Sequence, residues 1–290
     1  MGYPLNMREN FLPGVIGCFS MHAAVNPAAE LIDRAFRSYD IPFRCVNFEV
    51  GQLGLLAAVG GAKAMGFRGL CCSMPNKIRV MSCMDEIAES ARFAGAVNTV
   101  IIEKGGRMRG ENTDGRGFVK AVSPLMDLKD AKVVILGAGG VARAIGMELA
   151  RAGASRIGII NRHEGAANIL AHHISVNTGA MTSVISWDHT IHLPGNVDLI
   201  VNATPLGLYP TEDSSIDLDI SSLRESMVVA DCIPNPSETR FVKDARARGC
   251  QVLTGKTLLA NQAALSIKLW TGEDIPPAYL SEEYGRLLSR

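Results

Sequence analysis

The sequence has no excess of charge of either sign, because 29 Lys and Arg residues balance 29 Asp and Glu residues. Without a basic surplus it has little to neutralise a phosphate backbone, so we expect no nucleic-acid partner. It also has no apolar run of membrane-spanning length: the most apolar stretch, Leu53 to Met65, is broken by glycines and by Lys63. The first eleven residues contain Arg8 and Glu9 but no apolar h-region. These absences predict a cytoplasmic protein that binds neither nucleic acid nor a membrane.

Cysteine and histidine patterns that build disulfide frameworks or zinc sites are also missing. The seven cysteines form an odd, scattered set without a C-x-x-C pair, so we expect most of them to be small buried residues. We expect four histidines to lie at the surface, because none of them has an acidic residue at the spacing of metal ligands. They are His172, His173, His189 and His192, and we expect no metal site.

What the chain does contain is a dinucleotide-binding pattern between Ala131 and Arg162. The hydrophobic pattern predicts a strand over residues 133–136, a helix over 141–150 and a second strand over 156–160. Gly137, Gly139 and Ala142 separate the first strand from the helix with the spacing G-x-G-x-x-A. The first glycine allows a tight turn, the second lets a pyrophosphate approach the backbone, and the alanine permits close helix packing. We therefore expect a pyrophosphate at the helix N-terminus, where unpaired N–H groups favour an anion.

The residues at the end of the second strand select the cofactor. An acidic side chain there would bind the ribose 2'-hydroxyl of NAD, whereas this chain has Asn161 and Arg162. An amide and a guanidinium can both donate hydrogen bonds to a 2'-phosphate, so the prediction is NADP. The alternative is that Arg162 is an ordinary solvated arginine and that the cofactor is NAD.

The flanking sequence predicts an α/β protein with two α/β domains, of which the N-terminal one has a mostly parallel sheet. Ahead of the glycine turn we expect strands over 14–20, 43–49 and 69–73, helices over 28–39, 53–65 and 78–93, and a hairpin over 97–102 and 107–110. After the turn we expect strands over 198–202, 227–231 and 251–254. Because ligands of such sheets lie beyond the carboxyl ends of the strands, Thr204 and Cys232 should border the cofactor. The helix over 257–270 is expected to return to the N-terminal domain.

Several motifs together resemble those of the shikimate dehydrogenase family. Residues 69–77, Gly-Leu-Cys-Cys-Ser-Met-Pro-Asn-Lys, resemble the family's signature, a strand that ends in a V-T-V-P-F-K type motif. Further matches follow in the family's order: Ala94–Thr99, Gly110–Gly115, Gly137–Gly140, Asn161–Arg162, Asn202–Gly207, and Gly255 with Gln262. This resemblance spans most of the chain. It implies a substrate-binding catalytic domain over 1–113, completed by helices within 256–290, and a Rossmann NADP-binding domain over 114–255.

The resemblance also implies a reaction, the NADP-dependent interconversion of shikimate, or a related cyclic hydroxy acid such as quinate, and its 3-dehydro ketone. Oxidising a secondary alcohol with a nicotinamide requires hydride to leave carbon while a base removes the hydroxyl proton. Lys77 and Asp114 match the family's catalytic pair. Asn98 and Gln262 match positions that bind the substrate's hydroxyl groups, and Ser73 stands where the family usually has a threonine. The implied cofactor-binding residues are Gly137, Ala138, Gly139, Gly140, Val141, Asn161, Arg162, Thr204, Cys232 and Gly255.

Some departures from the family pattern concern the ligands. The S-x-S-P motif that holds the substrate carboxylate is replaced by Met-His-Ala-Ala-Val-Asn-Pro over 21–27. Losing two hydrogen bonds to a charged group would weaken binding by roughly 3 to 6 kcal/mol unless other groups substituted. Pro234 stands where a substrate-reaching tyrosine is usual, and Ala166 where NADP-specific members often carry a second arginine. Met74 and the missing tyrosine resemble the shikimate dehydrogenase-like branch. The nearby side chains that could replace the two serines are Ser20, His22 and Asn26.

Other functions stay open at this point. The same reaction could use NAD on a quinate-like compound. The missing serines also suit a catalytically weak, ligand-sensing homologue that keeps the fold. A third alternative is an unrelated two-domain enzyme such as a folate dehydrogenase, which the Asn-Thr-Asp-Gly stretch over 112–115 disfavours. A homodimer is one of the assemblies that the sequence leaves open.

Overall fold

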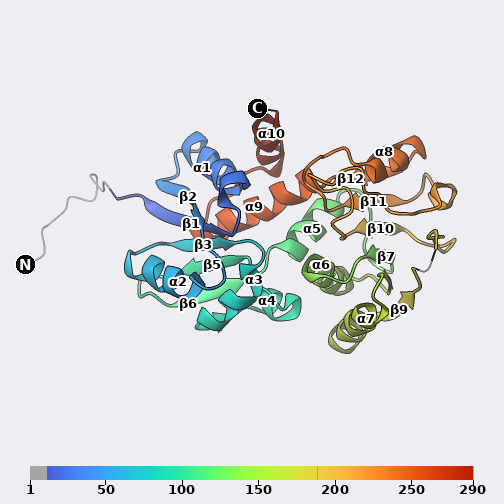
Figure 1. The fold of residues 1–290 in the computed structure, drawn as a ribbon, viewed down its shortest axis with the longest axis horizontal. Coiled ribbons are helices and arrows are strands. Elements are labelled where there is room, and N and C mark those ends of the chain that lie inside the picture. The colour runs from blue at the N-terminus through green and yellow to red at the C-terminus, as the bar shows by residue number, and fades with distance from the viewer. Residues whose placement is uncertain (1–11, 188, 290) are drawn as a thin grey trace, which may run out of the picture. The chain divides into compact units, whose positions relative to one another are not determined.

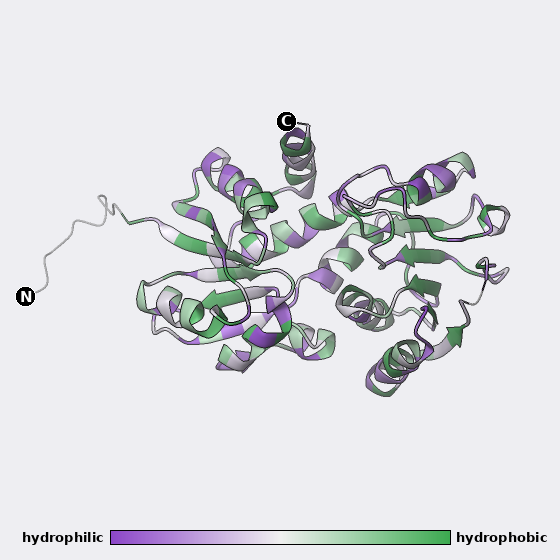
Figure 2. Ribbon diagram, in the orientation of Figure 1, coloured by the Kyte–Doolittle hydropathy of each residue, from purple (hydrophilic) through white to green (hydrophobic). Residues whose placement is uncertain are grey.

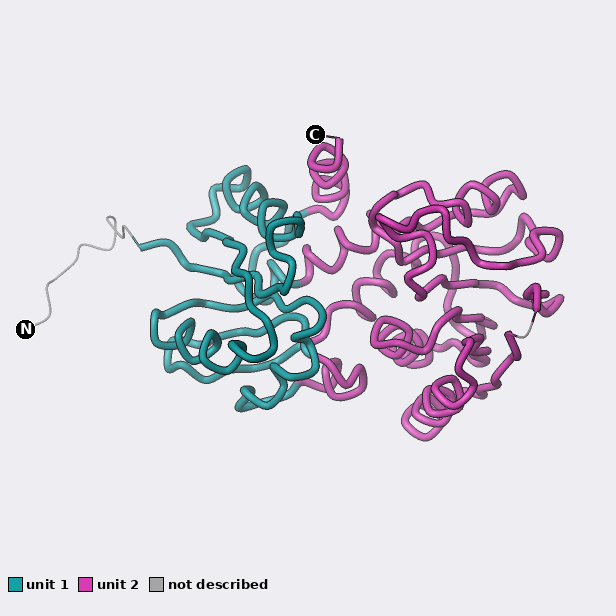
Figure 3. The backbone as a smooth tube through the Cα atoms, in the orientation of Figure 1, with its two compact units in different colours: residues 1–87, 97–111, 266–275 teal, residues 88–96, 112–265, 276–290 magenta. Residues whose placement is uncertain are grey.

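The chain divides into two compact units (Figure 3). The computed structural model describes residues 12–187 and 189–289, so the predicted lack of an apolar leader over Met1 to Phe11 lies outside the described residues. One unit consists of residues 1–87, 97–111 and 266–275, and the other of residues 88–96, 112–265 and 276–290. Each unit is built on its own six-stranded sheet, as the sequence predicts for two α/β domains. The functional domain boundaries at 113–114 and 255–256 stay a prediction.

The sheet of the first unit is mixed, with the strand order β2-β1-β3-β5-β6-β4 (Figure 1). β1 pairs in parallel with β2 and β3, while β5 pairs antiparallel with β3 and β6. Parallel neighbours need crossover helices, and α1 and α2 supply them. The elements of this unit are β1 (Gly14–Ser20), a 3-10 turn (Ala23–Val25), α1 (Ala28–Ser38), β2 (Phe43–Glu49), α2 (Leu55–Ala64), β3 (Gly69–Cys72), α3 (Asn76–Arg79), a second 3-10 turn (Val80–Cys83), β4 (Glu86–Ile87), β5 (Thr99–Ile102) and β6 (Met108–Glu111).

The continuous helix expected over residues 78–93 is wrong. The structure has the short helix α3, a 3-10 turn and strand β4 there, and only then the helix α4 (Glu89–Ala94). The cause is a pairing with a distant strand: the backbone of Asp85 donates to Met108 O at 2.9 Å, and its carboxylate accepts from Met108 N at 2.7 Å. A local hydrophobic period cannot reveal hydrogen bonds between segments more than twenty residues apart.

The sheet of the second unit is entirely parallel, with the order β12-β11-β10-β7-β8-β9. This order reverses between β7 and β10, which is the topological switch point where doubly wound sheets bind dinucleotides. The elements are α4, α5 (Asp114–Val122), β7 (Lys132–Leu136), α6 (Gly140–Arg151), β8 (Arg156–Ile160), α7 (Glu164–Thr178), β9 (Met181–Ile185), β10 (Leu199–Asn202), a 3-10 turn (Ile220–Ser222), β11 (Val228–Asp231), α8 (Arg240–Ala247), β12 (Gln251–Leu253), the first part of α9 (Gly255–Thr271) and α10 (Pro277–Leu288).

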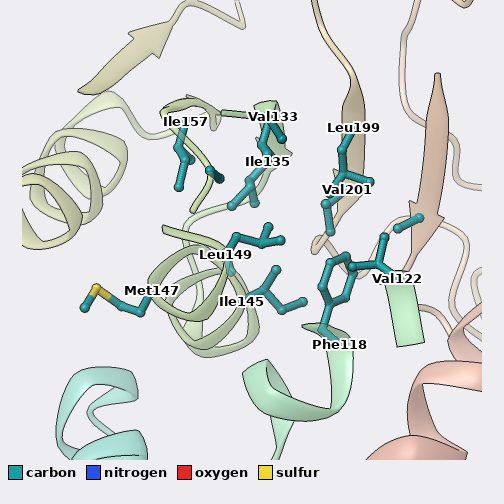
Figure 4. Close-up of a cluster of buried hydrophobic side chains, with 14 of the residues drawn as sticks. Phe118, Val122, Val133, Ile135, Ile145, Met147, Leu149, Ile157, Leu199 and Val201 are labelled. Atoms are coloured by element: carbon teal, nitrogen blue, oxygen red, sulfur yellow. The ribbon is translucent and has the colours of Figure 1, made fainter. Parts of the chain in front are cut away.

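The central strands β10 and β11 of this second sheet are apolar up to their last residues, which are Asn202 and Asp231. All four residues of β10 and of β11 are buried, and Figure 2 shows these strands in green. A strand covered on both faces by other elements is expected to be continuously hydrophobic. On one face Phe118 of α5 and Ile145 of α6 pack with Ile135 and Val201 in a core cluster (Figure 4). This packing holds the carboxyl ends of β7 and β10 in place.

The helix expected over residues 257–270 exists as α9, and its residues from Ser266 onward belong to the first unit. There the Ser266 and Thr99 hydroxyls lie 2.8 Å apart, and the Trp270 indole donates to Val100 O at 2.9 Å. Over the described part of the chain, no helix combines the length and the apolar character that crossing a membrane would need.

Candidate dinucleotide and substrate sites

The glycine turn lies at the carboxyl end of β7, where the sheet order reverses. Gly137 has φ +106, a backbone conformation that side chains rarely adopt, and a Cβ there would lie 2.9 Å from Ala203 O. Ala142 is completely buried, which allows α6 to pack closely. A Cβ built on Gly139, by contrast, meets no atom within 4 Å. The turn is thus a backbone cradle with open space at its second glycine, and it fits the pyrophosphate of a dinucleotide.

This openness gives a prediction for Gly139→Ala. Since Gly139 has φ −82 and free space around it, an added methyl group should leave the melting temperature unchanged. It would occupy the space that the pyrophosphate needs, and we expect dinucleotide binding to weaken about tenfold, which corresponds to about 1.4 kcal/mol. Calorimetric titration with NADPH, beside a thermal melt, measures both.

Gly165→Ala is the matched control, because a Cβ at Gly165 in α7 also meets no atom within 4 Å. We expect it to change neither the melting temperature nor the dissociation constant. Equal loss of binding in both variants would mean that the Gly139 space does not receive the ligand.

The two residues predicted to select the cofactor follow β8 directly. Asn161 donates through Nδ2 to His163 O at 2.9 Å, which shapes the turn into α7. Arg162 is exposed, and its guanidinium carbon lies 5.2 Å from the centre of the Trp187 ring. Sequence reasoning missed Trp187, because it follows β9, a strand that the sequence analysis did not predict.

A buried network joins the carboxyl ends of β10 and β11. Asn202 donates to Asp231 at 2.9 Å, and its oxygen accepts from the Thr204 hydroxyl at 2.6 Å. The other oxygen of Asp231 accepts from Thr239 at 2.5 Å. Burial raises the pKa of Asp231, and the hydrogen bonds from Thr239, Ile233 and Asn202 oppose that rise. The network therefore fixes Thr204 beside the glycine turn, where Ala203 approaches Gly137.

Cys232 and Gly255 lie at the same end of the sheet. A Cβ at Gly255 would fall 2.1 Å from Ile233 O, so only glycine lets α9 begin against the loop after β11. Burial raises the pKa of the Cys232 thiol, and the nearby carboxylates of Asp231 and Asp114 add to that effect. Asp114 therefore lies near the end of β11.

Asp114 is the first residue of α5 and is 4% exposed. Its backbone N–H donates to the Asn112 side chain at 3.0 Å, and Asn112 in turn donates to Ala96 O at 3.0 Å. The helix approaches α6 so closely that a Cβ at Gly115 would lie 2.2 Å from Ala144 O. The turn before α5 thus holds the backbone of Asp114 in place, as the Asn-Thr-Asp-Gly motif suggests.

Gln262, predicted to bind substrate, lies in the N-terminal part of α9 and is half-buried. It packs against α5, where a Cβ at Gly117 would lie 2.9 Å from its Cγ. Both glycines of α5 therefore serve close helix contacts, and Gln262 and Asp114 project from helices that touch each other.

The three predicted residues of the first unit gather at the carboxyl end of β3. Ser73 follows that strand directly, and the last strand residue, Cys72, donates its backbone N–H to Asn98 O at 2.8 Å. Val97 N donates to Lys77 O at 2.8 Å, which ties the lysine to the segment carrying Asn98. The backbones of Ser73, Lys77 and Asn98 thus come together just beyond the end of β3, and a hydroxyl, an amine and an amide are a set suited to a polyhydroxylated ligand.

Lys77 is held by its neighbour in α3. Asn76 is completely buried and donates through Nδ2 to Val50 O at 2.8 Å, which fixes the helix against the end of β2. Lys77 itself is half-buried. Burial raises the pKa of the Cys72 thiol, and the positive charge of Lys77 opposes this rise, so the ammonium lies near that thiol. Cys72 stays a protonated, unreactive thiol.

The segment that replaces the S-x-S-P motif forms a 3-10 turn over Ala23–Val25. The buried Ser20 hydroxyl accepts from His22 N at 3.2 Å, and the Asn26 side chain accepts from Ala28 N at 3.0 Å. Two of the three candidate replacements thus accept hydrogen bonds from the local backbone, and the third, His22, is exposed. This turn therefore has no pair of hydroxyls like the one that binds a carboxylate in the family.

The remaining polar side chains show no arrangement for a metal ion. Within residues 12–187 and 189–289, no cluster of three or more His, Cys, Asp or Glu side chains could hold one. The seven cysteines are free thiols, four of them buried, in agreement with the sequence prediction. His172, His189 and His192 are exposed as expected. His173 is half-buried and lies 2.8 Å from Phe93 O.

A parallel six-stranded sheet with an open glycine turn at its switch point defines a dinucleotide-binding α/β protein. A family model described as shikimate dehydrogenase substrate binding domain matches residues 24–100, and one described as shikimate / quinate 5-dehydrogenase matches residues 120–237. The chain belongs to the shikimate dehydrogenase family, whose members are NAD(P)-dependent oxidoreductases that act on a hydroxyl group.

Three similar proteins illustrate the family. The chain is 34% identical to a shikimate dehydrogenase (NADP(+)) from Alkaliphilus oremlandii, over 94% of this chain and 96% of that one. It is 32% identical to a quinate/shikimate dehydrogenase from Escherichia coli, over 93% and 96% of the two chains. The ligand-free crystal structure of 5-ketofructose reductase from Gluconobacter sp. strain CHM43 superposes with a TM-score of 0.92 at 39% identity, covering 96% of this chain and all of that one (100%).

Proposed function

We propose that this protein is an NADP-dependent dehydrogenase that interconverts shikimate, or a related cyclic hydroxy acid such as quinate, and its 3-dehydro ketone. The observation that carries this proposal is the gathering of Ser73, Lys77 and Asn98 at the carboxyl end of β3. These side chains can bind several hydroxyl groups and supply an ionisable amine beside them. The names of the Alkaliphilus and Escherichia relatives agree with such a substrate.

The reaction needs a hydride carrier, which the nicotinamide supplies when the dinucleotide is bound. In this proposal Lys77 transfers the hydroxyl proton, and Asp114 is the second member of the catalytic pair that the family motifs imply. Asn98 and Gln262 bind hydroxyl groups of the substrate, since an amide both donates and accepts hydrogen bonds. The buried hydrogen bonds of Asn76 and Asn112 anchor the backbone segments that carry the two catalytic residues.

The proposed cofactor is NADP. The chain has a basic residue, Arg162, where an acidic one would favour NAD, and the turn at Gly139 leaves open space for the pyrophosphate. Around this turn Gly137, Ala138, Gly140 and Val141 form the proposed backbone cradle, while Thr204, Cys232 and Gly255 border it from the neighbouring strand ends. We also propose a cytoplasmic location and a homodimer. Sedimentation analysis measures the oligomeric state.

A neutral polyhydroxy ketone is the second candidate substrate. The turn over Ala23–Val25 lacks the two hydroxyls that would bind a carboxylate. Removing two such hydrogen bonds would cost roughly 3 to 6 kcal/mol for shikimate or quinate and nothing for an uncharged substrate. The Gluconobacter relative is named as a reductase of 5-ketofructose, a sugar without a carboxylate. This reading keeps the same cofactor and the same proton-transferring lysine.

A spectrophotometric assay at 340 nm separates these functions. Shikimate and quinate are offered with NADP+ and NAD+, and 5-ketofructose with NADPH and NADH, to the wild-type protein and to Lys77→Ala. Turnover of shikimate or quinate with NADP+ supports the first proposal. Turnover of 5-ketofructose alone supports the second candidate. If the protein binds NADPH but Lys77→Ala alters no turnover, it is a ligand-sensing homologue.

A further inference from the structure

Arg162, the cation among the proposed cofactor-binding residues, lies over an aromatic ring. β8 and β9 pair in parallel, with Ile160 opposite Ile185. Arg162 and Trp187 each follow two residues later, so the sheet register places them side by side. The guanidinium carbon of Arg162 lies 5.2 Å from the centre of the Trp187 ring, within the range of a cation–π interaction.

The indole of Trp187 is itself anchored. Trp187 is half-buried and packs against the core cluster that includes Leu136, Ile160 and Val229. Arg162, in contrast, is exposed and has no ion pair with any residue that the structure describes. The tryptophan ring is thus the fixed partner and the arginine the movable one.

The chain also lacks a second cation close to Arg162 on the following helix. Ala166, where NADP-specific relatives often have an arginine, is exposed on α7 and carries no charge. A single arginine loses rotamer entropy when it binds a phosphate. A stacked aromatic ring reduces that loss, because the guanidinium is already restrained before the ligand arrives.

We infer that Trp187 is a positioning residue that holds the Arg162 guanidinium in place for the 2'-phosphate of NADP, and so contributes to the choice of NADP over NAD. The inference rests on the proposed function, since it assumes that NADP binds at the glycine turn. Trp187 does not touch the reacting atoms, and its effect passes through Arg162. It should therefore influence the affinity for NADPH but not that for NADH.

The test compares Trp187→Leu, which keeps an apolar anchor without a π face, with Trp187→Phe, which keeps an aromatic ring. Dissociation constants for NADPH and NADH are measured by calorimetric titration. We expect Trp187→Leu to weaken NADPH binding about fivefold and to leave the dissociation constant for NADH within about twofold of the wild-type value. Trp187→Phe should restore most of the NADPH affinity. In an Arg162→Ala background, Trp187→Leu should have no further effect.

Phe93→Leu is the matched control. Phe93 lies under the guanidinium of Arg151, 5.0 Å from its carbon, and Arg151 is the last residue of α6, at the opposite end of that helix from the glycine turn. We expect this variant to change neither dissociation constant.

Two results would overturn the inference: equal weakening of NADPH and NADH by Trp187→Leu, which indicates a structural role, or no weakening of either. If the wild-type protein does not prefer NADPH to NADH, the proposed cofactor is wrong as well. Comparing the dissociation constants of the wild-type protein for NADPH and NADH therefore distinguishes failure of the proposed function from failure of the Trp187 role.

Discussion

Replacing Lys77 with alanine should lower kcat about a thousandfold, because a positioned proton-transferring group contributes between about a hundredfold and ten-thousandfold. Lys77 lies on α3 just after β3, its backbone carbonyl accepts from Val97 N, and α3 is fixed by the buried Asn76. Removing the amine leaves this scaffold intact. The loss should therefore appear in turnover of whichever substrate the wild-type protein accepts.

Dinucleotide binding should be unchanged in Lys77→Ala, since the proposed cofactor residues all belong to the other compact unit. Steady-state kinetics at saturating NADP+ gives kcat, and calorimetric titration gives the dissociation constant. Arg79→Ala is the control, because Arg79 is exposed on the same short helix. A kcat within tenfold of the wild type in Lys77→Ala, or an equal loss in Arg79→Ala, would remove Lys77 from the mechanism.

Replacing Arg162 with alanine should weaken NADPH binding about thirtyfold. A charge-assisted hydrogen bond contributes about 1.5 to 3 kcal/mol, and 2 kcal/mol corresponds to about thirtyfold in a dissociation constant. Binding of NADH, which has no 2'-phosphate, should stay within about twofold. Arg162→Lys keeps the charge but loses the planar fork, and we expect an intermediate loss. Calorimetric titration of both dinucleotides gives the preference directly.

The control for this prediction is Arg156→Ala. Arg156 is exposed at the first position of β8, at the opposite end of the same strand from Arg162. It has the same charge and belongs to the same sheet, so it reports any general electrostatic contribution to binding. If Arg156→Ala and Arg162→Ala weaken NADPH equally, or if Arg162→Ala weakens NADH as much as NADPH, Arg162 does not recognise the 2'-phosphate.

Local signals in the sequence account for much of the fold. The apolar runs of β1 and β2 were predicted at their observed bounds, and the glycine spacing at residues 137–142 indicated the turn and the helix after it. These predictions succeeded because strand and helix periods, and the need for glycine at φ +106, are properties of neighbouring residues. The resemblance to the family's motifs also predicted polar residues just after several of the strands.

The predictions from the sequence are wrong or incomplete where distant segments interact. The expected helix over residues 78–93 is broken because Asp85 pairs with Met108, and no local pattern records that pairing. Trp187 escaped notice for a related reason. Only the parallel register of β8 and β9 brings it beside Arg162, and β9 is a short, partly exposed strand.

Hydrophobic period and glycine spacing were enough to indicate two α/β domains with a dinucleotide turn, because these patterns act over a few neighbouring positions. The oxidoreductase activity was implied by the resemblance of the motifs to those of the shikimate dehydrogenase family. The three-dimensional fold decided which of those residues meet. It gathered Ser73, Lys77 and Asn98 at one strand end, left the Ala23–Val25 turn without a hydroxyl pair, and stacked Arg162 on Trp187. Such contacts depend on sheet register and on packing between segments far apart in the chain, which no local pattern encodes.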